Sequence, residues 1–420
     1  MKFVGKILRE LEKSRYWDES MQRIQDKRFL GNEDKLEVSY MHYLKGKDYY
    51  LDMIKSGQFQ FGVCEKRELK KPGSNKVRVV YISSLEERYI LGALYRACTE
   101  VFKDVVSPNV FSYKRQTGTV HAMEYLMGDG RIHEKVGLKM DISAYFNSVR
   151  EESLRSVVDE VTEDDLEIRK MLESLLFCHR VKFKGEEITE YKSLVPGNPF
   201  SSFLANYCLK ELDISIVKEF GMTYARYSDD IVIFANNHSE LSKGASEVSK
   251  MLEIHGLKLN EKKYEEFKPM DEISYLGLKL FQGVVDISDE SREKFKRKIK
   301  KSVERGRRAV ERDGKDPYKE AQKLFREFNS RVYKSYLRDK KKFGWAYYSF
   351  RYVNTMETLR ELDFYLKDRA RYLITGKNNR ANHRSVPDSV LEELGYQSLC
   401  KMFKMFKSDF DYYCDSVDLM

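Results

Sequence analysis

The clearest pattern along the chain is a strict alternation of apolar and polar positions just before residue 142. Apolar residues occupy every second position from Val136 to Ile142, and Asp141 falls between the last two of them. Side chains of a strand alternate between its two faces, so the apolar residues share one face and Asp141 lies on the other. The pattern predicts a strand that ends with Asp141 on its polar face, where the carboxylate can serve a site.

A second pair of strand-like runs, 222–226 and 231–234, flanks the tetrapeptide Tyr-Ser-Asp-Asp at 227–230. This arrangement predicts a β-hairpin with Asp229 and Asp230 at its tip. Two adjacent buried carboxylates are costly unless a cation neutralises them. The simplest explanation is a divalent metal site with oxygen ligands, and Mg²⁺ is the ion that suits such ligands.

The remaining periodicities predict an α+β chain with an all-α C-terminal part. Residues 1 to about 60 have helical spacing, and from Ser291 the pattern is helical almost to the end. The other predicted elements are strands at 59–63, 77–82, 257–259 and 273–280, and helices at 90–101, 199–220 and 241–255.

Composition excludes several classes of protein. The chain has 420 residues, enough for about two to three structural units. No run approaches the ~18 apolar residues of a membrane span, and the N-terminus lacks the apolar region of a signal peptide. Six scattered cysteines without a Cys-x-x-Cys pair argue against a zinc knuckle or a disulfide framework. We therefore expect a cytoplasmic protein with no membrane partner.

The net charge of +9 is concentrated in one element. Ten Lys or Arg and two Glu lie between Ser291 and Arg308, which leaves 66 basic and 65 acidic residues in the rest of the chain. Same-sign residues at helical spacing repel one another and require an anionic partner. The predicted basic helix therefore favours contact with a nucleic-acid backbone.

Five segments occur in the order and spacing of motifs A to E of the reverse transcriptase palm, which they resemble. They are 139–148, 196–213, 227–230, 256–263 and 275–278, and the upstream segments 76–78 and 111–115 resemble the finger motifs. The resemblance covers roughly residues 57–335. It implies a right-hand polymerase fold with fingers, palm and a helical thumb, followed by an all-α C-terminal extension.

The resemblance implies the metal chemistry of that family. Asp141, the adjacent Ile142, Asp229 and Asp230 would hold two Mg²⁺ ions, which serve in-line displacement at phosphorus. Asp141 and Asp229 would each bind both ions, and Asp230 would be a supporting carboxylate. Lys263 matches the motif D lysine and is the candidate proton donor to the leaving pyrophosphate. The three aspartates and Lys263 are thus the predicted catalytic residues.

The same resemblance implies four nucleotide-binding residues. Lys76 and Arg78 would bind the β- and γ-phosphates of the incoming dNTP. Phe146 would stack under the sugar and crowd a 2′-hydroxyl, which favours dNTPs over rNTPs. Gly197 would let the backbone approach the templating base without a Cβ in the way.

On the thumb, the resemblance implies contacts to the template–primer backbone. The candidates are Lys294, Arg297, Lys298 and Lys301 on the basic helix, with Arg369, Arg371, Lys377 and Arg380 as further RNA contacts near the C-terminus. The implied domains are an N-terminal helical extension (1–56), fingers with part of the palm (57–135), palm (136–285), thumb (286–335) and a helical RNA-binding extension (336–420).

The N-terminal segment and the C-terminal tail resemble the bacterial "unknown group" of defence-associated reverse transcriptases. This implies an RNA-directed DNA polymerase that copies a bound non-coding RNA into cDNA for antiphage defence. Val195-Pro-Gly197 departs from the usual Pro-Gln-Gly, which bears on template handling. The alternatives are a template-independent, protein-primed polymerase of the abortive-infection type, a retron reverse transcriptase, or an RNA-binding module with an inactive palm.

Overall fold

The structure is a computed structural model that describes residues 5–27, 30–70, 77–115, 117–333, 345–379 and 381–417; of residues 409–417 it describes the backbone alone. The chain divides into two compact units, Met1–Lys268 and Pro269–Met420. Among the described helices, none is long and apolar enough to cross a membrane. The boundary between the units falls inside the range 136–285, and the five-part division made from the sequence stays a prediction.

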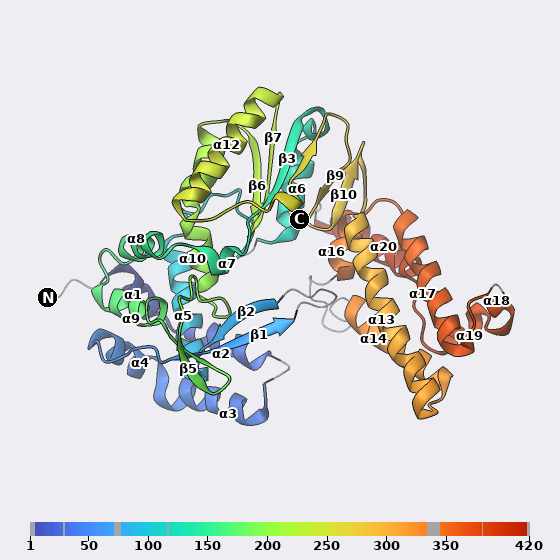
Figure 1. Cartoon of the computed structure of the whole chain (residues 1–420), viewed down its shortest axis with the longest axis horizontal. Coiled ribbons are helices and arrows are strands. Elements are labelled where there is room, and N and C mark those ends of the chain that lie inside the picture. The colour runs from blue at the N-terminus through green and yellow to red at the C-terminus, as the bar shows by residue number, and fades with distance from the viewer. Residues whose placement is uncertain are drawn as a thin grey trace. The chain divides into compact units, whose positions relative to one another are not determined.

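The first unit contains a four-stranded antiparallel sheet, called the central sheet below, which lies beside the helix His238–Ile254 (α12 in Figure 1). Its order is β6-β7-β3-β8, with β3 Val136–Asp141, β6 Thr223–Tyr227, β7 Asp230–Ala235 and β8 Glu265–Phe267. Strand β3 is the strand predicted from the alternating pattern, and β6 and β7 form the predicted hairpin. Both faces of β3 are covered, since Phe234 of β7 lies where a side chain at Gly137 would stand. The sheet is therefore a buried platform, with the aspartates at one end.

Three helices pack against this sheet: α6 Thr119–Gly128, α11 Lys210–Lys218 and α12 His238–Ile254. The prediction of a single helix over 199–220 is wrong. The chain forms α10 Ser201–Cys208 and then α11, because Leu209 takes φ −103° and ψ 15° and buries its side chain in the core. A residue with these backbone angles cannot continue an α-helix.

A second sheet in the first unit has the order β2-β1-β4-β5. Its strands are β1 Cys64–Lys70, β2 Val77–Ile82, β4 Arg180–Phe183 and β5 Glu186–Thr189. The predicted strand at 59–63 is wrong, although Phe59 and Phe61 are buried. The amides of Phe61 and Gly62 donate to the side chains of Ser174 and Glu87 instead of to a neighbouring strand.

The N-terminal helices share one hydrophobic core with both sheets. They are α1 Lys6–Leu11, α2 Ser14–Gln25, α3 Asn32–Tyr40, the π-helix η1 Met41–Lys45, α4 Gly46–Lys55 and α5 Leu85–Val101, with α8 Glu151–Val161 and α9 Leu166–Leu176 from later in the chain. Trp17 stacks on Tyr50 and contacts Tyr89, which ties α2, α4 and α5 together. The Asp165 carboxylate accepts from the first amides of α1. These contacts make the N-terminal helices part of the first unit.

The second unit begins with a small sheet of order β11-β10-β9 and continues as helices. The predicted strand over 273–280 is wrong, because Leu276 and Gly277 have positive φ (48° and 88°) and turn the chain into a hairpin. The elements are β9 Ile273–Tyr275, β10 Leu278–Phe281, β11 Val284–Ile287, α13 Asp289–Asp313, α14 Pro317–Val332, α16 Trp345–Tyr352, α17 Glu357–Thr375, α18 Asn382–Ser385, α19 Asp388–Glu393 and α20 Leu399–Val417.

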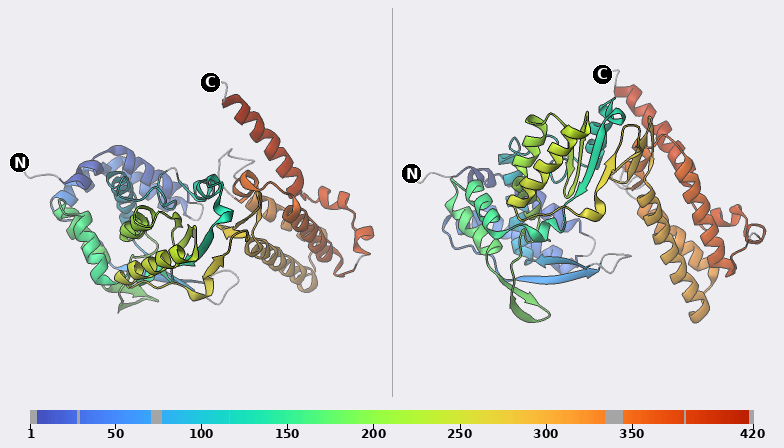
Figure 2. Two further views of the ribbon diagram at one scale, coloured as in Figure 1. Left: turned by 90° about the horizontal axis from the view of Figure 1, so that it is seen from above. Right: turned by 45° about the horizontal axis from the view of Figure 1, so that its top comes forward.

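Helices α13, α14 and α17 pack on one another, as Figure 2 shows from two directions. Gly306 of α13 lies against Leu373 of α17, so a larger residue at this position would clash. The helical content after residue 288 confirms the predicted all-α C-terminal part.

Candidate active site

The β6–β7 hairpin brings three carboxylates to one end of the central sheet. Asp141, the last residue of β3, is the register partner of Asp230, the first residue of β7. Directly paired residues on neighbouring strands point to the same face, with Cβ atoms about 4.5–5.5 Å apart. The amide of Ile142 donates to the carbonyl oxygen of Asp229 across 2.9 Å, which places Asp229 beside them. The aspartates that sequence reasoning singled out are thus neighbours.

Asp141 is held by two polar side chains from a later segment. It is only 5% exposed, and Asn260 Nδ2 donates to its Oδ1 across 3.1 Å. Lys263 Nζ lies 2.5 Å from the other carboxylate oxygen. The amide of Asn260 also donates to the Asp141 carbonyl. The short 3-10 helix η3 Glu261–Lys263 begins at the next residue and ends at Lys263. The predicted catalytic lysine therefore lies at the predicted catalytic aspartate.

The charges of these groups act on one another. Burial, and then the neighbouring charges of Asp229 and Asp141, raise the pKa of Asp230 to about 6. Burial alone would lower the pKa of Lys263, but its hydrogen bond to Asp141 and the three negative charges outweigh burial and raise it. The end of the sheet therefore carries an excess of negative charge that favours cations.

The donor set at this position fits divalent cations. Three carboxylates offer the oxygen ligands that Mg²⁺ takes, and Ile142 could contribute only its backbone carbonyl. Within the described part of the chain, however, no three His, Cys, Asp or Glu side chains are placed so that together they could hold a metal ion. The Lys263 ammonium instead neutralises Asp141. Burial and then the charges of Asp229 and Asp141 raise the pKa of Asp230, and a bound cation would oppose this rise.

A buried ion pair supports the hairpin from beneath, and sequence reasoning missed it. Arg226 and Asp213 are fully buried, and Arg226 donates to Asp213 from Nε (2.7 Å) and Nη2 (2.6 Å). Arg226 Nη1 also donates to the carbonyl of Ser228 across 3.3 Å. The Tyr224 hydroxyl completes the arrangement by donating to Asp213. An arginine within the apolar run 222–226 was the available signal, since such a charge requires a buried partner.

The turn residue Ser228 is held on its other side by the segment 111–115. Its amide donates to Ser112 Oγ across 2.8 Å, and its hydroxyl lies 2.9 Å from that of Tyr113. Ser228 has φ 62°, a left-handed conformation that is uncommon outside glycine. These contacts and the Arg226 bond hold the turn in that conformation.

The predicted nucleotide-binding residues differ in their burial and in their contacts. Phe146 is half-buried on α7 Tyr145–Ser148, with its ring edge-on to Tyr113 at 5.9 Å between centroids. Arg78 is exposed on β2, and Lys76 lies outside the described residues. Gly197 has φ 116°, and a Cβ there would lie 2.8 Å from the Tyr81 carbonyl. The structure thus gives Gly197 a packing role, and its template contact stays a prediction.

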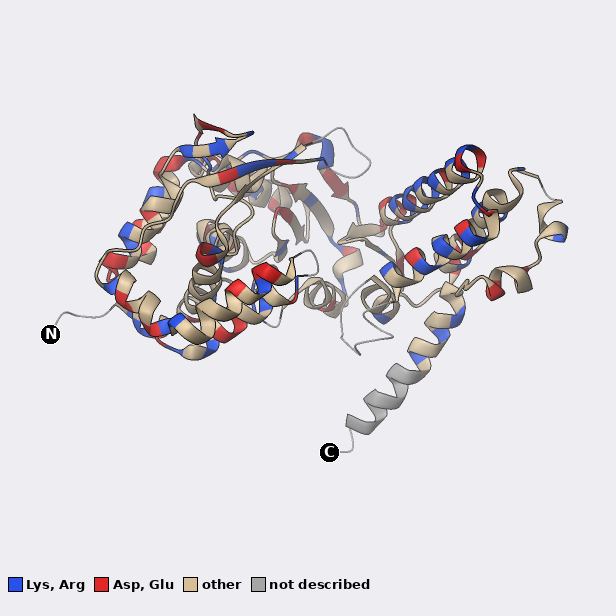
Figure 3. Ribbon diagram, turned by 90° about the horizontal axis from the view of Figure 1, so that it is seen from below, with Lys and Arg blue, Asp and Glu red and all other residues tan. Residues whose placement is uncertain are grey.

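The predicted thumb residues share one side of α13. Lys294, Arg297, Lys298 and Lys301 are exposed, and no carboxylate of the described residues pairs with them. We call these four residues the α13 cation face. Other cations of the helix are paired instead; Lys296, for example, binds Glu361 of α17. Burial and then repulsion from Lys294 and Arg331 lower the pKa of Lys298. Figure 3 shows basic residues recurring along the long helices of this unit.

The predicted RNA contacts near the C-terminus need correction. Arg371 is buried and donates to Asp388 and to the Val386 carbonyl, so it fastens α17 to the following segment and cannot reach RNA. Arg369 pairs with Asp368. Lys377 is exposed, and Arg380 lies outside the described residues.

Comparison with known proteins decides the family. Residues 69–280, half of the chain, match the family model described as "Reverse transcriptase (RNA-dependent DNA polymerase)". The chain belongs to the reverse transcriptase family. The match contains all three aspartates and Lys263, and it confirms the right-hand polymerase fold. Enzymes of this family use divalent metal ions, which agrees with the carboxylate donor set.

Two curated relatives are retron reverse transcriptases of Escherichia coli. The chain is 28% identical to the Ec48 enzyme over 137 residues, which is 32% of this chain and 31% of the relative. It is 24% identical to the Ec86 enzyme over 234 residues, 55% of this chain and 67% of the relative. The matches thus span about a third and two thirds of the relatives' lengths.

Among solved structures, the chain is similar to two telomerases. Apo telomerase from Candida tropicalis matches with a TM-score of 0.43 and 12% identity, covering 58% of this chain and 60% of the other. Telomerase from Candida albicans, in a complex with a fragment of telomeric RNA, matches with a TM-score of 0.43 and 11% identity over 84% and 67% of the chains.

Proposed function

We propose that this protein is an RNA-directed DNA polymerase that copies a bound RNA into cDNA. The observation that carries the proposal is the meeting of Asp141, Asp229 and Asp230 at the end of the β3–β7 pair. The register of β3 and β7, which pairs Asp141 with Asp230, supports this proposal. Arg226 and Ser112 both bond to Ser228 and so hold the turn that carries Asp229. Catalytic residues need such supporting contacts to keep their geometry.

The cofactor that we propose is a pair of Mg²⁺ ions held by Asp141, Asp229 and Asp230. When bound, such a pair activates the primer 3′-hydroxyl and stabilises the charge of the triphosphate and the leaving pyrophosphate. Lys263 Nζ lies on an Asp141 carboxylate oxygen that would hold a cation, so the ammonium would have to leave that oxygen for the cation to bind there. An ammonium released from Asp141 would still be protonated at neutral pH, as an ordinary lysine is, and would be the proton donor to the leaving pyrophosphate.

The sugar and the nucleic-acid backbone have separate partners in this proposal. Phe146 lies five residues beyond Asp141 and packs against Tyr113, which fixes its ring beside the catalytic turn. A fixed ring there excludes a 2′-hydroxyl and selects dNTPs. The α13 cation face binds phosphates of the template–primer duplex, and its lack of carboxylate partners within the described part of the chain leaves it available.

The template that we propose is a structured non-coding RNA, and the cDNA serves antiphage defence. This finer proposal rests on the resemblance of the terminal segments to defence-associated enzymes. The two relatives described as retron reverse transcriptases favour a second candidate, a retron enzyme. Both candidates copy RNA, so they differ in the template and not in the site.

Sequencing of the nucleic acids that co-purify with the full chain from its native host tests the proposal. One abundant RNA together with DNA complementary to it is the expected result. DNA of random or simple sequence without a complementary RNA would contradict templated copying and favour the protein-primed alternative. Bound RNA without any DNA, unchanged in an Asp229→Ala/Asp230→Ala variant that still protects against phage, would identify a binding module.

A further inference from the structure

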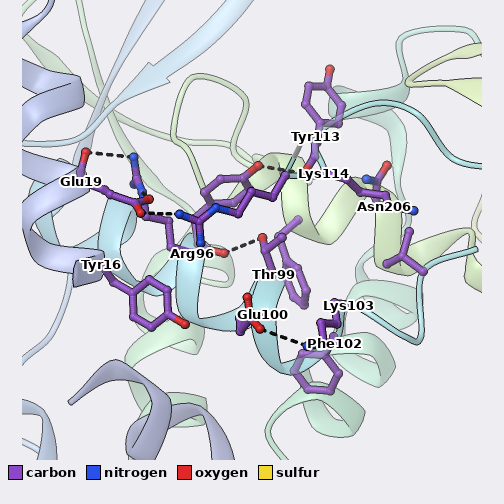
Figure 4. Close-up of a pocket in the computed structure, with 14 residues that line it drawn as sticks. Tyr16, Glu19, Arg96, Thr99, Glu100, Phe102, Lys103, Tyr113, Lys114 and Asn206 are labelled. Atoms are coloured by element: carbon purple, nitrogen blue, oxygen red, sulfur yellow. Dashed lines mark hydrogen bonds and ion pairs between the residues drawn. The ribbon is translucent and has the colours of Figure 1, made fainter. Parts of the chain in front are cut away.

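A cavity of about 300 Å³ lies in the first unit, and none of the predicted catalytic or nucleotide-binding residues lines it (Figure 4). Its walls come from helices α2, α5 and α10 and from the loop between residues 102 and 115. The same loop carries Ser112 and Tyr113, which hold the catalytic turn. The cavity therefore lies next to the segment that holds the catalytic turn.

Aromatic rings make up much of the wall. Tyr16, Tyr95, Phe102 and Phe203 all line the cavity, and Phe102 and Phe203 pack on each other at 5.7 Å between centroids. Flat apolar rings of this kind favour a planar ring as occupant, because such rings stack with an energy of about 1–3 kcal/mol for each nucleobase.

The charged groups of the wall are predominantly basic. Glu19 is shared between Arg96 Nε at 2.8 Å and Arg115 Nη2 at 2.7 Å, so one carboxylate faces two guanidinium groups. Lys103 pairs with Glu100. Lys114 Nζ donates to the Ser107 carbonyl across 2.9 Å, and no carboxylate of the described residues pairs with it. The wall therefore carries two positive charges in excess of its carboxylates.

Lys114 is the cation of the wall that an anionic ligand would stabilise most, because no carboxylate of the described residues pairs with it. It is half-buried, and burial lowers the pKa of its ammonium, which a nearby negative charge would stabilise. The volume of about 300 Å³ is at the lower end of small-molecule pockets. It suits a single nucleotide and excludes a nucleic-acid helix.

We propose that this cavity binds a small aromatic anion of the nucleoside monophosphate class, with its ring on Tyr95 and its phosphate at Lys114 and Arg115. The occupant acts on the catalytic turn through two hydrogen bonds. The Tyr95 hydroxyl donates to the Tyr113 carbonyl across 2.8 Å, and the Tyr113 hydroxyl lies 2.9 Å from Ser228 Oγ. The cavity is thus an effector site for the polymerase centre.

Titration calorimetry with adenosine 5′-monophosphate tests the proposal. The background is the full chain carrying Asp229→Ala and Asp230→Ala, so that binding at the catalytic carboxylates does not contribute. Saturable binding is expected, weakened about tenfold or more by Lys114→Met and by Arg115→Gln. Lys243→Met, an exposed lysine on α12 outside the cavity, is the matched control and leaves the affinity unchanged. Adenosine, which lacks the phosphate, is expected to bind more weakly.

Three results would overturn the proposal: no saturable binding at millimolar nucleotide, binding that neither variant weakens, or binding of oligonucleotides alone. Arg115 is exposed, so its variant remains informative if Lys114→Met fails to fold.

Tyr113→Phe tests the link between the cavity and the catalytic turn, because it removes the hydroxyl that contacts Ser228 and keeps the ring. Because this change removes the hydrogen bond between the cavity wall and the turn, it is expected to shift the nucleotide affinity about threefold or more. An unchanged affinity would remove the link to the catalytic turn.

Discussion

Removing the carboxylate beneath the catalytic turn should destabilise the first unit strongly. Asp213→Leu leaves the Arg226 guanidinium fully buried without its two bonds of 2.7 and 2.6 Å. Stranding one member of a buried pair costs about 3–5 kcal/mol. The double variant Asp213→Leu/Arg226→Met removes both charges at similar volume, and such replacements are often neutral for stability. Urea denaturation should therefore show a large loss for the single variant. The double variant should recover part of that loss, because the buried Tyr224 hydroxyl still lacks its acceptor.

The double variant separates the effect of the ion pair on protein stability from its effect on catalysis. It lacks the Nη1 bond to the Ser228 carbonyl, so the turn that carries Asp229 loses one of its supports. A hydrogen bond from a charged donor contributes about 1.5–3 kcal/mol. If the loss of this hydrogen bond raises the free energy of the transition state by the same amount, kcat falls about ten- to a hundredfold. Primer extension with the active fraction titrated measures this effect.

Arg371→Met in the second unit provides the matched control for this experiment. Arg371 is likewise a buried arginine with a carboxylate partner, and its bonds go to Asp388 and the Val386 carbonyl. Its loss should lower stability and leave kcat per folded enzyme unchanged. A double variant at 213 and 226 that regains stability and polymerises at the wild-type rate would refute the reasoning.

Three further changes test other parts of the account. Phe146→Ala should admit ribonucleotides in single-nucleotide extension, and unchanged discrimination would remove its role at the sugar. Neutralising the α13 cation face to Gln should make the slope of log affinity against log salt shallower by about 3–4, at roughly 0.9 for each phosphate contact. The same change at the ion-paired Lys296 and Arg305 should alter the slope little. Gly197→Ala should cost about 1–3 kcal/mol in urea denaturation, because φ 116° and the Tyr81 carbonyl at 2.8 Å oppose a Cβ; wild-type stability would contradict this packing role.

Local patterns were sufficient to predict the centre of the site. The period-two alternation before Ile142 predicted β3, and the acidic tip between two apolar runs predicted the hairpin. The strand register that joins Asp141 to Asp230 then follows from the pairing of β3 and β7. The short-range signals were strong because both elements are buried and regular.

Errors occurred where tertiary contacts or single turn residues decide the outcome. The helix break at Leu209 and the turn at Leu276–Gly277 each depend on one or two residues within a periodic run. The Arg226–Asp213 pair joins a strand to a helix, so no local pattern connects its members. Arg371 was assigned to RNA because sequence alone does not distinguish a buried arginine from an exposed one.

Primer extension on a defined RNA template tests the central claim most directly. The purified full chain, given a DNA primer, dNTPs and Mg²⁺, should make DNA complementary to the template. Asp141→Asn should abolish synthesis, because it removes the carboxylate that faces Asp230 and binds Lys263. Product that does not match the template, or synthesis that persists in Asp141→Asn, would contradict the assignment of this site to RNA-directed DNA synthesis.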